Sequence, residues 1–447
     1  DCHILEARAR AGGRCWTVRA GTTETELDGE EQVAAFDQGL YFNPGPARIP
    51  HHHQTTLNYC KAFGLAVEVF TNVNEAAYYY HEEAGPLSGQ KVRIREAKTD
   101  MRGYVSELLA KALRQDQLDL PLTPNDRERM VAYLRADGGL APDLSYQGAE
   151  WRGYMTPPGA GLQAGMPGKP HDLSTLLDAG FGYNFNLEYA FDQQMTMFQI
   201  AGGTDQLAQA FERQVGQQIQ YEAEVREIRK KPEGVAIVYA DKSGQLQQLE
   251  GDFCICTIPL SVLRDIPADF SSKMQAAIRA INYIPTGKMG LQFSRRFWEE
   301  DEQIFGGITR TNMNITQIWY PSWGYLSQKG ILLGYYHFGD QAIEMGQLSP
   351  AGREARALEE GRKIHPQYDE TFEASFSVAW HKIKYTLGGW AFYFSDTREQ
   401  YYPTLNEPDG AIYLAGEHVS YLNGWMAGAL ESAQQVVTAI HERVLSK

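Results

Sequence analysis

The sequence is poor in cysteine and has no excess of basic residues. Its five cysteines are Cys2, Cys15, Cys60, Cys254 and Cys256. Because they are odd in number and scattered, they do not suggest a disulfide framework, and a reducing, cytoplasmic location is expected. The formal net charge of −15 argues against the basic face that nucleic acid or an anionic membrane surface requires. No apolar run is long enough to span a bilayer, so no membrane partner is expected.

A glycine-rich phosphate loop is also missing from the sequence, because no Gly-x-Gly-x-x-Gly stands between a strand pattern and a helix pattern. Residues 2–6 nevertheless read as a strand that ends in Glu6. An acidic residue at the end of the second strand of a nucleotide-binding βαβ unit can bind ribose hydroxyls. Its usual partner is a glycine loop one strand upstream. We therefore expect that the first βα unit is missing from this chain or is supplied by another chain.

The remaining composition is that of a large globular protein. A chain of 447 residues is long enough for two or three domains. Three consecutive histidines, His51 to His53, open a predicted helix over residues 51–63. Neighbouring helix positions face different directions, so these histidines cannot all ligate one ion. We interpret them as residues of the helix start and expect no metal site.

Residues 411–445 predict a short strand, a loop closed by Asn423-Gly424, and a long helix that starts with small residues. Glu417 lies at the carboxyl end of the strand, where α/β sheets bind ligands. The free N–H groups and the positive dipole end of such a helix favour an anion. The alternative is an ordinary strand–turn–helix whose glycines serve only tight turns.

A second pattern, Leu-Glu-Ala-Arg-x-Arg-x-Gly-Gly-Arg over residues 5–14, is more specific. Together with residues 415–430 it resembles the flavin-dependent amine oxidase family, and within it the L-amino-acid oxidases most closely. That family also includes monoamine and polyamine oxidases and tryptophan monooxygenases. The resemblance extends over essentially the whole chain except for the first strand and its glycine loop.

The resemblance implies an α/β protein with a Rossmann-like FAD-binding domain, a mixed-sheet substrate domain and a helical domain. The FAD-binding domain would comprise residues 1–30, 196–283 and 405–447; the substrate domain residues 31–98 and 284–404; and the helical domain residues 99–195. The family also implies a homodimer.

The resemblance further implies which residues hold FAD. The adenosine ribose and the phosphates would be bound by Glu6 and Arg14, the adenine by the Val225 backbone, and the ribitol and phosphate end by Glu417. The complete set is Glu6, Ala7, Arg14, Gly45, Pro46, Ala47, Arg48, Val225, Glu417, Gly424, Trp425, Met426 and Ala427. Monoamine oxidases link FAD through a cysteine, and Gly389 stands at that place, so a non-covalent flavin is expected.

Arg48 lies in Gly-Pro-Ala-Arg-Ile-Pro, a rigid turn that displays one guanidinium just before a helix. A fixed arginine suits bidentate binding of a carboxylate, although a solvated arginine is the ordinary alternative. In the resembling L-amino-acid oxidases, an arginine at this place pairs with the substrate carboxylate. Ala47 replaces their methionine. Enzymes for plain amines do not need this residue, so Arg48 separates amino acids from amines.

The other expected substrate contacts also rest on the resemblance. Tyr335, in a strand pattern over residues 330–340, would help Arg48 to hold the carboxylate. The next residue, Tyr336, faces the opposite side of a strand, so a shift in register would change this assignment. Trp390 and Trp425 would form two walls beside the flavin, and the Gly424 carbonyl could accept a hydrogen bond from the substrate amine.

Lys288 interrupts a mostly apolar strand pattern over residues 284–293. A buried lysine is costly without partners, and burial lowers its pKa. The alternative is a strand-end lysine whose ammonium reaches solvent. The family has a lysine here that holds a water next to flavin N5, which makes Lys288 the expected catalytic residue.

The expected reaction is oxidative deamination of an L-amino acid by FAD and O2, giving a 2-oxo acid, ammonia and hydrogen peroxide. Hydride would pass from Cα to flavin N5. The alternatives are a tryptophan-monooxygenase-like reaction, oxidation of amines or polyamines, and a flavin-binding protein without turnover. The preferred side chain does not follow from the sequence.

Overall fold

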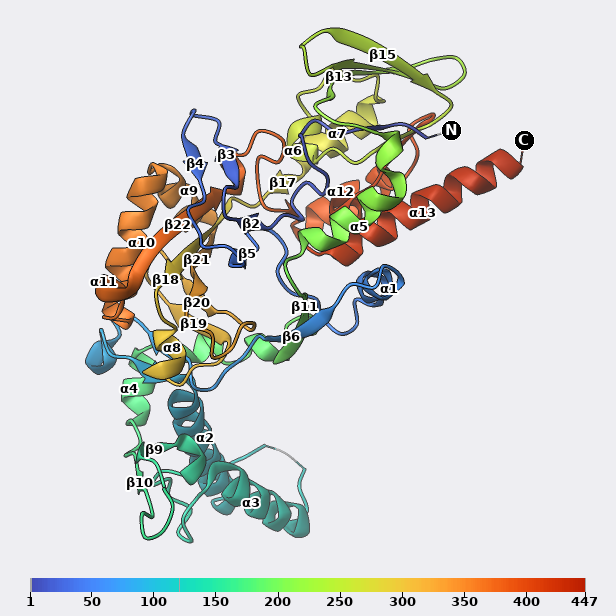
Figure 1. Ribbon diagram of the computed structural model, residues 1–447. Helices are drawn as coiled ribbons and strands as arrows, with labels where there is room; N and C mark the ends of the chain where they lie inside the picture. Colours follow the sequence, from blue (N-terminus) through green and yellow to red (C-terminus); the bar gives the residue numbers. More distant parts are fainter. Residues whose placement is uncertain (1, 120, 447) are drawn as a thin grey trace.

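The centre of the computed structural model, which describes residues 2–119 and 121–446, is a seven-stranded mixed sheet (Figure 1). Its strands, in spatial order, are β22 (Phe372–Ala379), β18 (Thr286–Phe293), β21 (Gly330–Phe338), β20 (Gln317–Tyr320), β19 (Gly307–Thr311), β7 (Tyr78–Tyr80) and β8 (Val92–Arg93). Every residue of β18 is buried. Such a continuous buried run fits a central strand that is covered on both faces.

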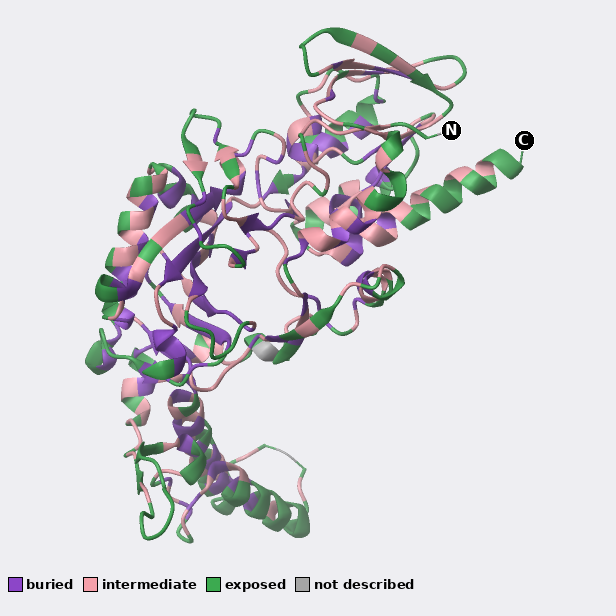
Figure 2. Ribbon diagram, viewed as in Figure 1, coloured by how far each residue is buried: buried purple, intermediate pink, exposed green. Residues whose placement is uncertain are grey.

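Helices cover one side of this sheet. These are α8 (Phe297–Glu300), α9 (Gly339–Gly346), α10 (Pro350–Ile364) and α11 (Tyr368–Thr371). Helices α9 and α10 pack against β18, β21 and β22 (Figure 1). The core between them is rich in aromatic rings, and Figure 2 shows the buried residues concentrated here. Ser349 caps the start of α10, because its hydroxyl accepts a hydrogen bond from the Gly352 N–H at 3.2 Å.

A second group of elements lies next to the C-terminal helix α13 (Met426–Leu445). This group contains two pairs of parallel strands, which are β1 (Ile4–Leu5) with β12 (Ile219–Gln220) and β16 (Cys254–Cys256) with β24 (Ile412–Leu414). The residues that follow β1, β16 and β24 line one cavity. An antiparallel sheet of β13 (Glu224–Lys230), β14 (Val235–Ala240) and β15 (Leu246–Gly251) adjoins them. The helices are α5 (Asp205–Val215), α6 (Leu260–Leu263), α7 (Ser272–Ala280) and α12 (Ser395–Leu405).

Short elements connect these two groups. They are β2 (Val18–Arg19) with β5 (Tyr41–Phe42), β3 (Thr23–Thr25) with β4 (Glu31–Val33), β6 (Val67–Thr71) with β11 (Thr196–Ile200), β17 (Asn282–Tyr283) with β23 (Ala391–Phe392), and α1 (Gln54–Ala62). Helix α5 begins after Thr204, whose hydroxyl donates to Asn43 Oδ1 and does not cap the helix.

The helical region projects away from the rest of the molecule at the bottom of Figure 1. It contains α2 (Ile94–Arg114), α3 (Pro124–Gly138), α4 (Leu173–Asp178) and the hairpin of β9 (Tyr154–Thr156) and β10 (Met166–Pro167). Since α2 begins at Ile94, the predicted border after residue 98 falls inside a helix. The mixed α/β architecture is confirmed, whereas the domain boundaries and the missing first βα unit stay predictions. Within residues 2–119 and 121–446, no helix has the length and apolar character needed to cross a bilayer.

A buried ion pair ties the N-terminal part of the chain to α10. The Arg353 guanidinium donates to both carboxylate oxygens of Glu26, at 2.5 and 2.7 Å. Lys382 adds a third contact to Glu26 at 2.9 Å. The side chains of Glu26 and Arg353 are almost completely shielded from solvent. Burial alone would raise the pKa of Glu26, but these cations hold it below its ordinary value.

We expect Arg353→Met to lower the free energy of unfolding by about 3 kcal/mol, because it leaves a buried carboxylate with only one cationic partner. Denaturant unfolding of the purified protein measures this. The double variant Glu26→Gln/Arg353→Met should lose less than the single variant, since no buried charge is left behind. Equal stability of Arg353→Met and the native chain would show that Lys382 alone satisfies Glu26.

Candidate cofactor and substrate site

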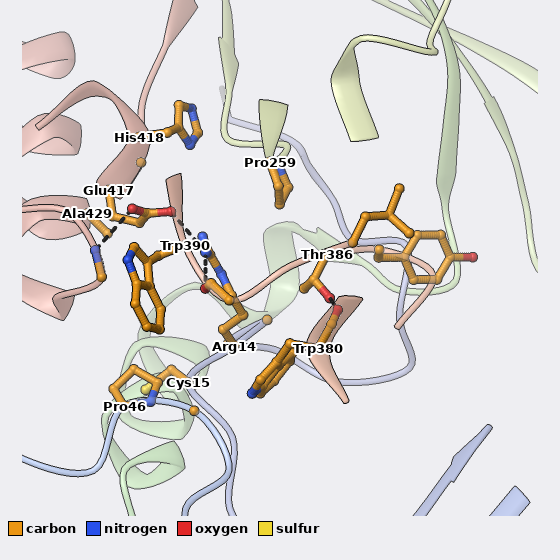
Figure 3. A pocket seen from close by; sticks show the side chains of 18 of the residues that line it. Arg14, Cys15, Pro46, Pro259, Trp380, Thr386, Trp390, Glu417, His418 and Ala429 are labelled. Atoms are coloured by element: carbon orange, nitrogen blue, oxygen red, sulfur yellow. Dashed lines mark hydrogen bonds and ion pairs between the residues drawn. The ribbon is translucent and has the colours of Figure 1, made fainter. Parts of the chain in front are cut away.

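The two groups of elements enclose a cavity of about 1190 Å³. A cavity of this volume exceeds the usual range for small ligands, about 300–1,000 Å³, and suits a long one. One end is lined by residues that follow β1, with Glu6 and Ala7, and by Val225 of β13. The other end is lined by side chains of the central sheet, including Lys288 and Tyr336. Arg14, Glu417 and Trp390 also line the cavity (Figure 3).

At the first end, Glu6 directly follows β1, and its Oε1 accepts a hydrogen bond from the Arg8 backbone N–H at 2.8 Å. Burial raises the pKa of Glu6. The Nη2 atom of Arg8 is buried and has no hydrogen-bond partner among the described residues. This end of the cavity therefore offers an acceptor for hydroxyl groups and a donor for an anion.

In the middle of the cavity, Arg14 and Glu417 form an ion pair at 2.9 Å (Figure 3). Arg14 Nη1 also donates to the Gly389 carbonyl at 2.6 Å. Burial lowers the pKa of Arg14, but the Glu417 carboxylate more than offsets this, so the pKa lies above its ordinary value. Glu417 accepts further bonds from the backbone N–H groups of Ala391, at 3.2 Å, and Gly424, at 3.1 Å. The pair thus fixes three chain segments around the cavity.

Helix α13 starts at this place. Gly424 has a φ of +76°, a left-handed conformation that favours glycine. Trp425 occupies the N-cap position without a side-chain cap, so the first N–H groups of the helix are available to a ligand. Met426 lines the cavity. The predicted contact Ala427 does not: its side chain is fully buried in protein, so it can serve a ligand only through its backbone.

At the second end, the Arg48 guanidinium lies over the Trp319 ring, 4.5 Å from its centroid, and donates to Asn72 Oδ1. Burial, the largest cause, lowers the pKa of Arg48 to about 10. Among the described residues no carboxylate forms an ion pair with it. Arg48 lines the cavity together with Gly45, Pro46 and Ala47. The predicted carboxylate-binding arginine is therefore in the cavity, stacked and uncompensated.

Lys288 is buried, with 4% of its surface exposed, and does not extend to solvent. Its Nζ donates to the Gly45 carbonyl at 2.6 Å and lies 4.4 Å from the centroid of the Tyr336 ring. Burial, and then the positive charge of Arg48, lower the pKa of Lys288 to about 7. Both protonation states of this amine are therefore accessible near neutral pH.

The structure corrects the assignment of Tyr335. This residue is 1% exposed and stacks on His337 within the core, away from the cavity. Tyr336 lines the cavity instead and pairs directly with Lys288 across β18 and β21. The reason is the alternation of side chains along a strand, by which neighbours face opposite sides. An irregularity in the pairing of β21 next to Gly334 shifts the register at this point, and the sequence gives no signal of it.

Trp390 and Trp425 both line the cavity. A Cβ placed on Gly424 would lie 3.2 Å from the Trp390 ring, so the absence of a side chain lets the turn approach that wall. The lining residues that were not found from the sequence include Asp192, Trp380 and His418. His418 is 1% exposed, and both of its ring nitrogens lack a partner among the described residues. Its place directly after Glu417 was the one available signal.

The family model for flavin-containing amine oxidoreductases matches residues 1–441. The chain belongs to this family. It is 28% identical to the Bacillus subtilis (strain 168) protein named "Putative L-amino-acid oxidase YobN", over 98% of this chain and 89% of the relative. It is 25% identical to an L-amino-acid oxidase of Gloydius blomhoffii, over 96% of this chain and 82% of the relative.

Two solved structures have a similar fold. A putrescine oxidase bound to putrescine has a TM-score of 0.64 and 16% identity, over 98% of this chain and 93% of that one. The cyclohexylamine oxidase of Brevibacterium oxydans has a TM-score of 0.62 and 15% identity, over 99% of this chain and 93% of that one. The chain therefore has the fold of the flavin amine oxidases, and its sequence relatives include L-amino-acid oxidases.

FAD is the cofactor of this family member, and the cavity fits it. Glu6 can accept from ribose hydroxyls. The unpaired nitrogens of Arg8 and His418 and the N-terminus of α13 offer donors for phosphate and for polar ring atoms. Trp390 and Trp425 line the same cavity, and aromatic side chains of this kind can pack against a flat ring system. The assignment of each contact to a part of the cofactor stays a prediction.

We expect Arg14→Met to lose most of its FAD during purification, because the variant removes a donor and leaves the Glu417 carboxylate without its cation. Visible absorbance relative to protein concentration measures the FAD content. Arg14→Lys retains the charge but not the fork geometry, so it should bind FAD more weakly than the native chain but better than Arg14→Met. Full FAD content in Arg14→Met would contradict this role.

Proposed function

We propose that the protein is an FAD-dependent L-amino-acid oxidase, which converts L-amino acids to 2-oxo acids with release of ammonia and hydrogen peroxide. One observation supports this most strongly: the Arg48 guanidinium lines the cavity, is buried, and has no carboxylate partner within the described residues. A buried cation is costly unless it is paired. The α-carboxylate of an amino acid would provide the missing partner.

The substrate carboxylate would be held by Arg48 and by the hydroxyl of Tyr336. Asn72 and the Trp319 ring fix the guanidinium on two sides, so little rotational freedom is lost on binding. Tyr336 keeps its proton, since burial raises the pKa of its hydroxyl to about 12. Its hydroxyl can therefore donate to a carboxylate. Here Tyr336 takes the role that the sequence had given to Tyr335.

The remaining contacts would orient the substrate. Trp390 and Trp425 restrict the space around the reacting carbon and exclude water, while the Gly424 carbonyl can accept from the amine. With carboxylate and amine both held, one enantiomer places its Cα–H toward the cofactor. Bound FAD supplies the chemistry of hydride acceptance and of electron transfer to O2. The start of α13 would stabilise negative charge on the bound cofactor.

Lys288 would act on protons and water near the reacting centre. With a pKa of about 7, its neutral form can accept a proton through a water molecule, and its ammonium form can return it. We also propose that FAD is held without a covalent bond. Gly389 provides no thiol, and burial raises the pKa of Cys15, which lines the cavity, to about 12. A thiol of that pKa is a poor nucleophile.

Two alternatives remain within the family. The structural neighbours oxidise amines without a carboxylate, as the names putrescine oxidase and cyclohexylamine oxidase state. Such a substrate would leave Arg48 unpaired. A tryptophan-monooxygenase-like outcome would give an amide and carbon dioxide, and mass spectrometry of the product distinguishes it from a 2-oxo acid. A screen of the twenty L-amino acids for peroxide release tests the proposal directly.

We expect Arg48→Leu to raise the KM for L-amino acids by about two orders of magnitude, the effect of losing one charged hydrogen-bonded pair. Steady-state peroxide release measures this. FAD should stay bound, as its absorbance will show, because the other predicted FAD contacts are retained. If Arg48→Leu turned over amino acids with the native KM, the carboxylate assignment would be wrong.

We expect kcat/KM to rise as the pH increases through about 7, because only the neutral form of Lys288 can accept a proton. A pH profile of the native chain and of Lys288→Met checks this. The variant should lose the inflection near neutral pH and retain any inflection that belongs to the free substrate. The same inflection in both proteins would assign the titration to another group.

A further inference from the structure

Asp192 is an acidic side chain at the substrate end of the cavity. It lies in the segment between the 3-10 helix η4 (Leu187–Tyr189) and β11, is half-buried, and lines the cavity beside Gln193. Its Oδ2 accepts a hydrogen bond from Trp425 Nε1 at 3.2 Å. Within the described part of the chain this is its one hydrogen bond or ion pair. The second carboxylate oxygen, Oδ1, is therefore available to a ligand.

The substrate end of the cavity thus holds an anionic group, Asp192, besides the basic residues Arg48, Lys288 and Arg310. The negative charge of Asp192 partly offsets the lowering of the pKa of Arg48 and of His53 by burial. Among the described residues, Asp192 forms no ion pair with either of them. Arg310 also lines the cavity, but it already has an interaction within the protein. The net charge of −15 further attracts cationic molecules.

We propose that Asp192 selects L-amino acids with a cationic side chain, such as lysine. The Asp192 carboxylate pairs with the distal ammonium, while Arg48 holds the α-carboxylate. This inference rests on the proposed function, since it uses Arg48 as the partner of the α-carboxylate. Among the described residues, neither Asp192 nor Arg48 has an ion-pair partner. A substrate that carries an α-carboxylate and a distal ammonium would supply one for each.

The position of Asp192 fits the distal ammonium better than the α-amine. Asp192 is bonded to the indole of Trp425, and among the described residues no hydrogen bond links it to Gly424, whose carbonyl is the proposed acceptor for the α-amine. A carboxylate beside the α-amine would also stabilise its protonated form. Oxidation requires the neutral amine, which makes that arrangement unproductive.

Three substrates that differ by one group test the proposal by peroxide release. L-Lysine carries both charges, L-norleucine lacks the distal ammonium, and cadaverine lacks the carboxylate. We expect kcat/KM for L-lysine to exceed that for L-norleucine by at least about tenfold, which is the lower range for one charged hydrogen bond. Cadaverine should be the poorest of the three, because it leaves Arg48 unpaired.

The variant Asp192→Asn removes the charge and keeps an acceptor for Trp425. It should lower the ratio of kcat/KM for L-lysine over L-norleucine at least about tenfold. Asp119→Asn is the matched control, because it changes the net charge by the same amount. Asp119 is exposed and lies between α2 and α3, outside the cavity lining. The control should retain the native ratio.

Binding without turnover gives a second readout. 6-Aminohexanoate has the carboxylate and distal ammonium of lysine but no α-amine, and hexanoate lacks both amines. Calorimetry on the FAD-loaded protein should show tighter binding of 6-aminohexanoate. In Asp192→Asn this preference should disappear, while measurable hexanoate binding shows that the variant is folded.

The outcomes separate the two proposals. A native preference for L-norleucine, a ratio that Asp192→Asn leaves unchanged, or an equal loss in Asp119→Asn would overturn the role of Asp192 and leave the amino-acid oxidase standing. Turnover of cadaverine without turnover of any amino acid would overturn the proposed function itself.

Discussion

The ion pair between Arg14 and Glu417 joins segments that lie 403 residues apart in the sequence. Arg14 follows the first strand, and Glu417 follows the last strand before α13. Glu417 also accepts from the backbone of Gly424 and of Ala391. Because both partners are largely buried, the pair is strong only when all these groups are in place. The start of α13 and the walls of the cavity depend on it.

The substrate end is organised in a similar way, by contacts between a turn and the central sheet. Two hydrogen bonds fix the backbone of the turn that carries Arg48: Lys288 Nζ donates to the Gly45 carbonyl, and Trp380 Nε1 donates to the Pro44 carbonyl. Lys288 of β18 and Trp380, which directly follows β22, thus position the turn that carries Arg48. Rigid elements of this kind position a site more accurately than mobile loops.

The residues that could be predicted from the sequence are those in local motifs. Glu6, Arg14, Arg48 and Glu417 lie in short patterns whose spacing is visible in the chain, and all four line one cavity. Lys288 was recognisable because a charge inside an apolar strand is unusual. The C-terminal helix α13 and the central strands β18 and β21 were also predicted from their residue patterns, whereas β19, β20 and β22 were not.

The remaining residues depend on tertiary structure. Tyr335 and Tyr336 are neighbours, and a single irregularity in strand pairing next to Gly334 decides which one reaches the cavity. Asp192 has no motif around it, and only the packing of its segment against Trp425 places it there. Helix α2 starts at Ile94 because the side chain of Glu96 accepts from the Arg93 backbone N–H, a capping interaction that hydrophobic periodicity does not report.

The closeness of Arg48 and Lys288 links the binding of an anion to the uptake of a proton. Arg48 is one cause of the low pKa of Lys288. An anion that neutralises the guanidinium weakens this repulsion, so the affinity of the amine for a proton rises on binding. By reciprocity, protonation of Lys288 strengthens the binding of the anion by the same factor. A carboxylate ligand therefore favours the ammonium form of Lys288, and this proton must leave before the amine can act as an acceptor.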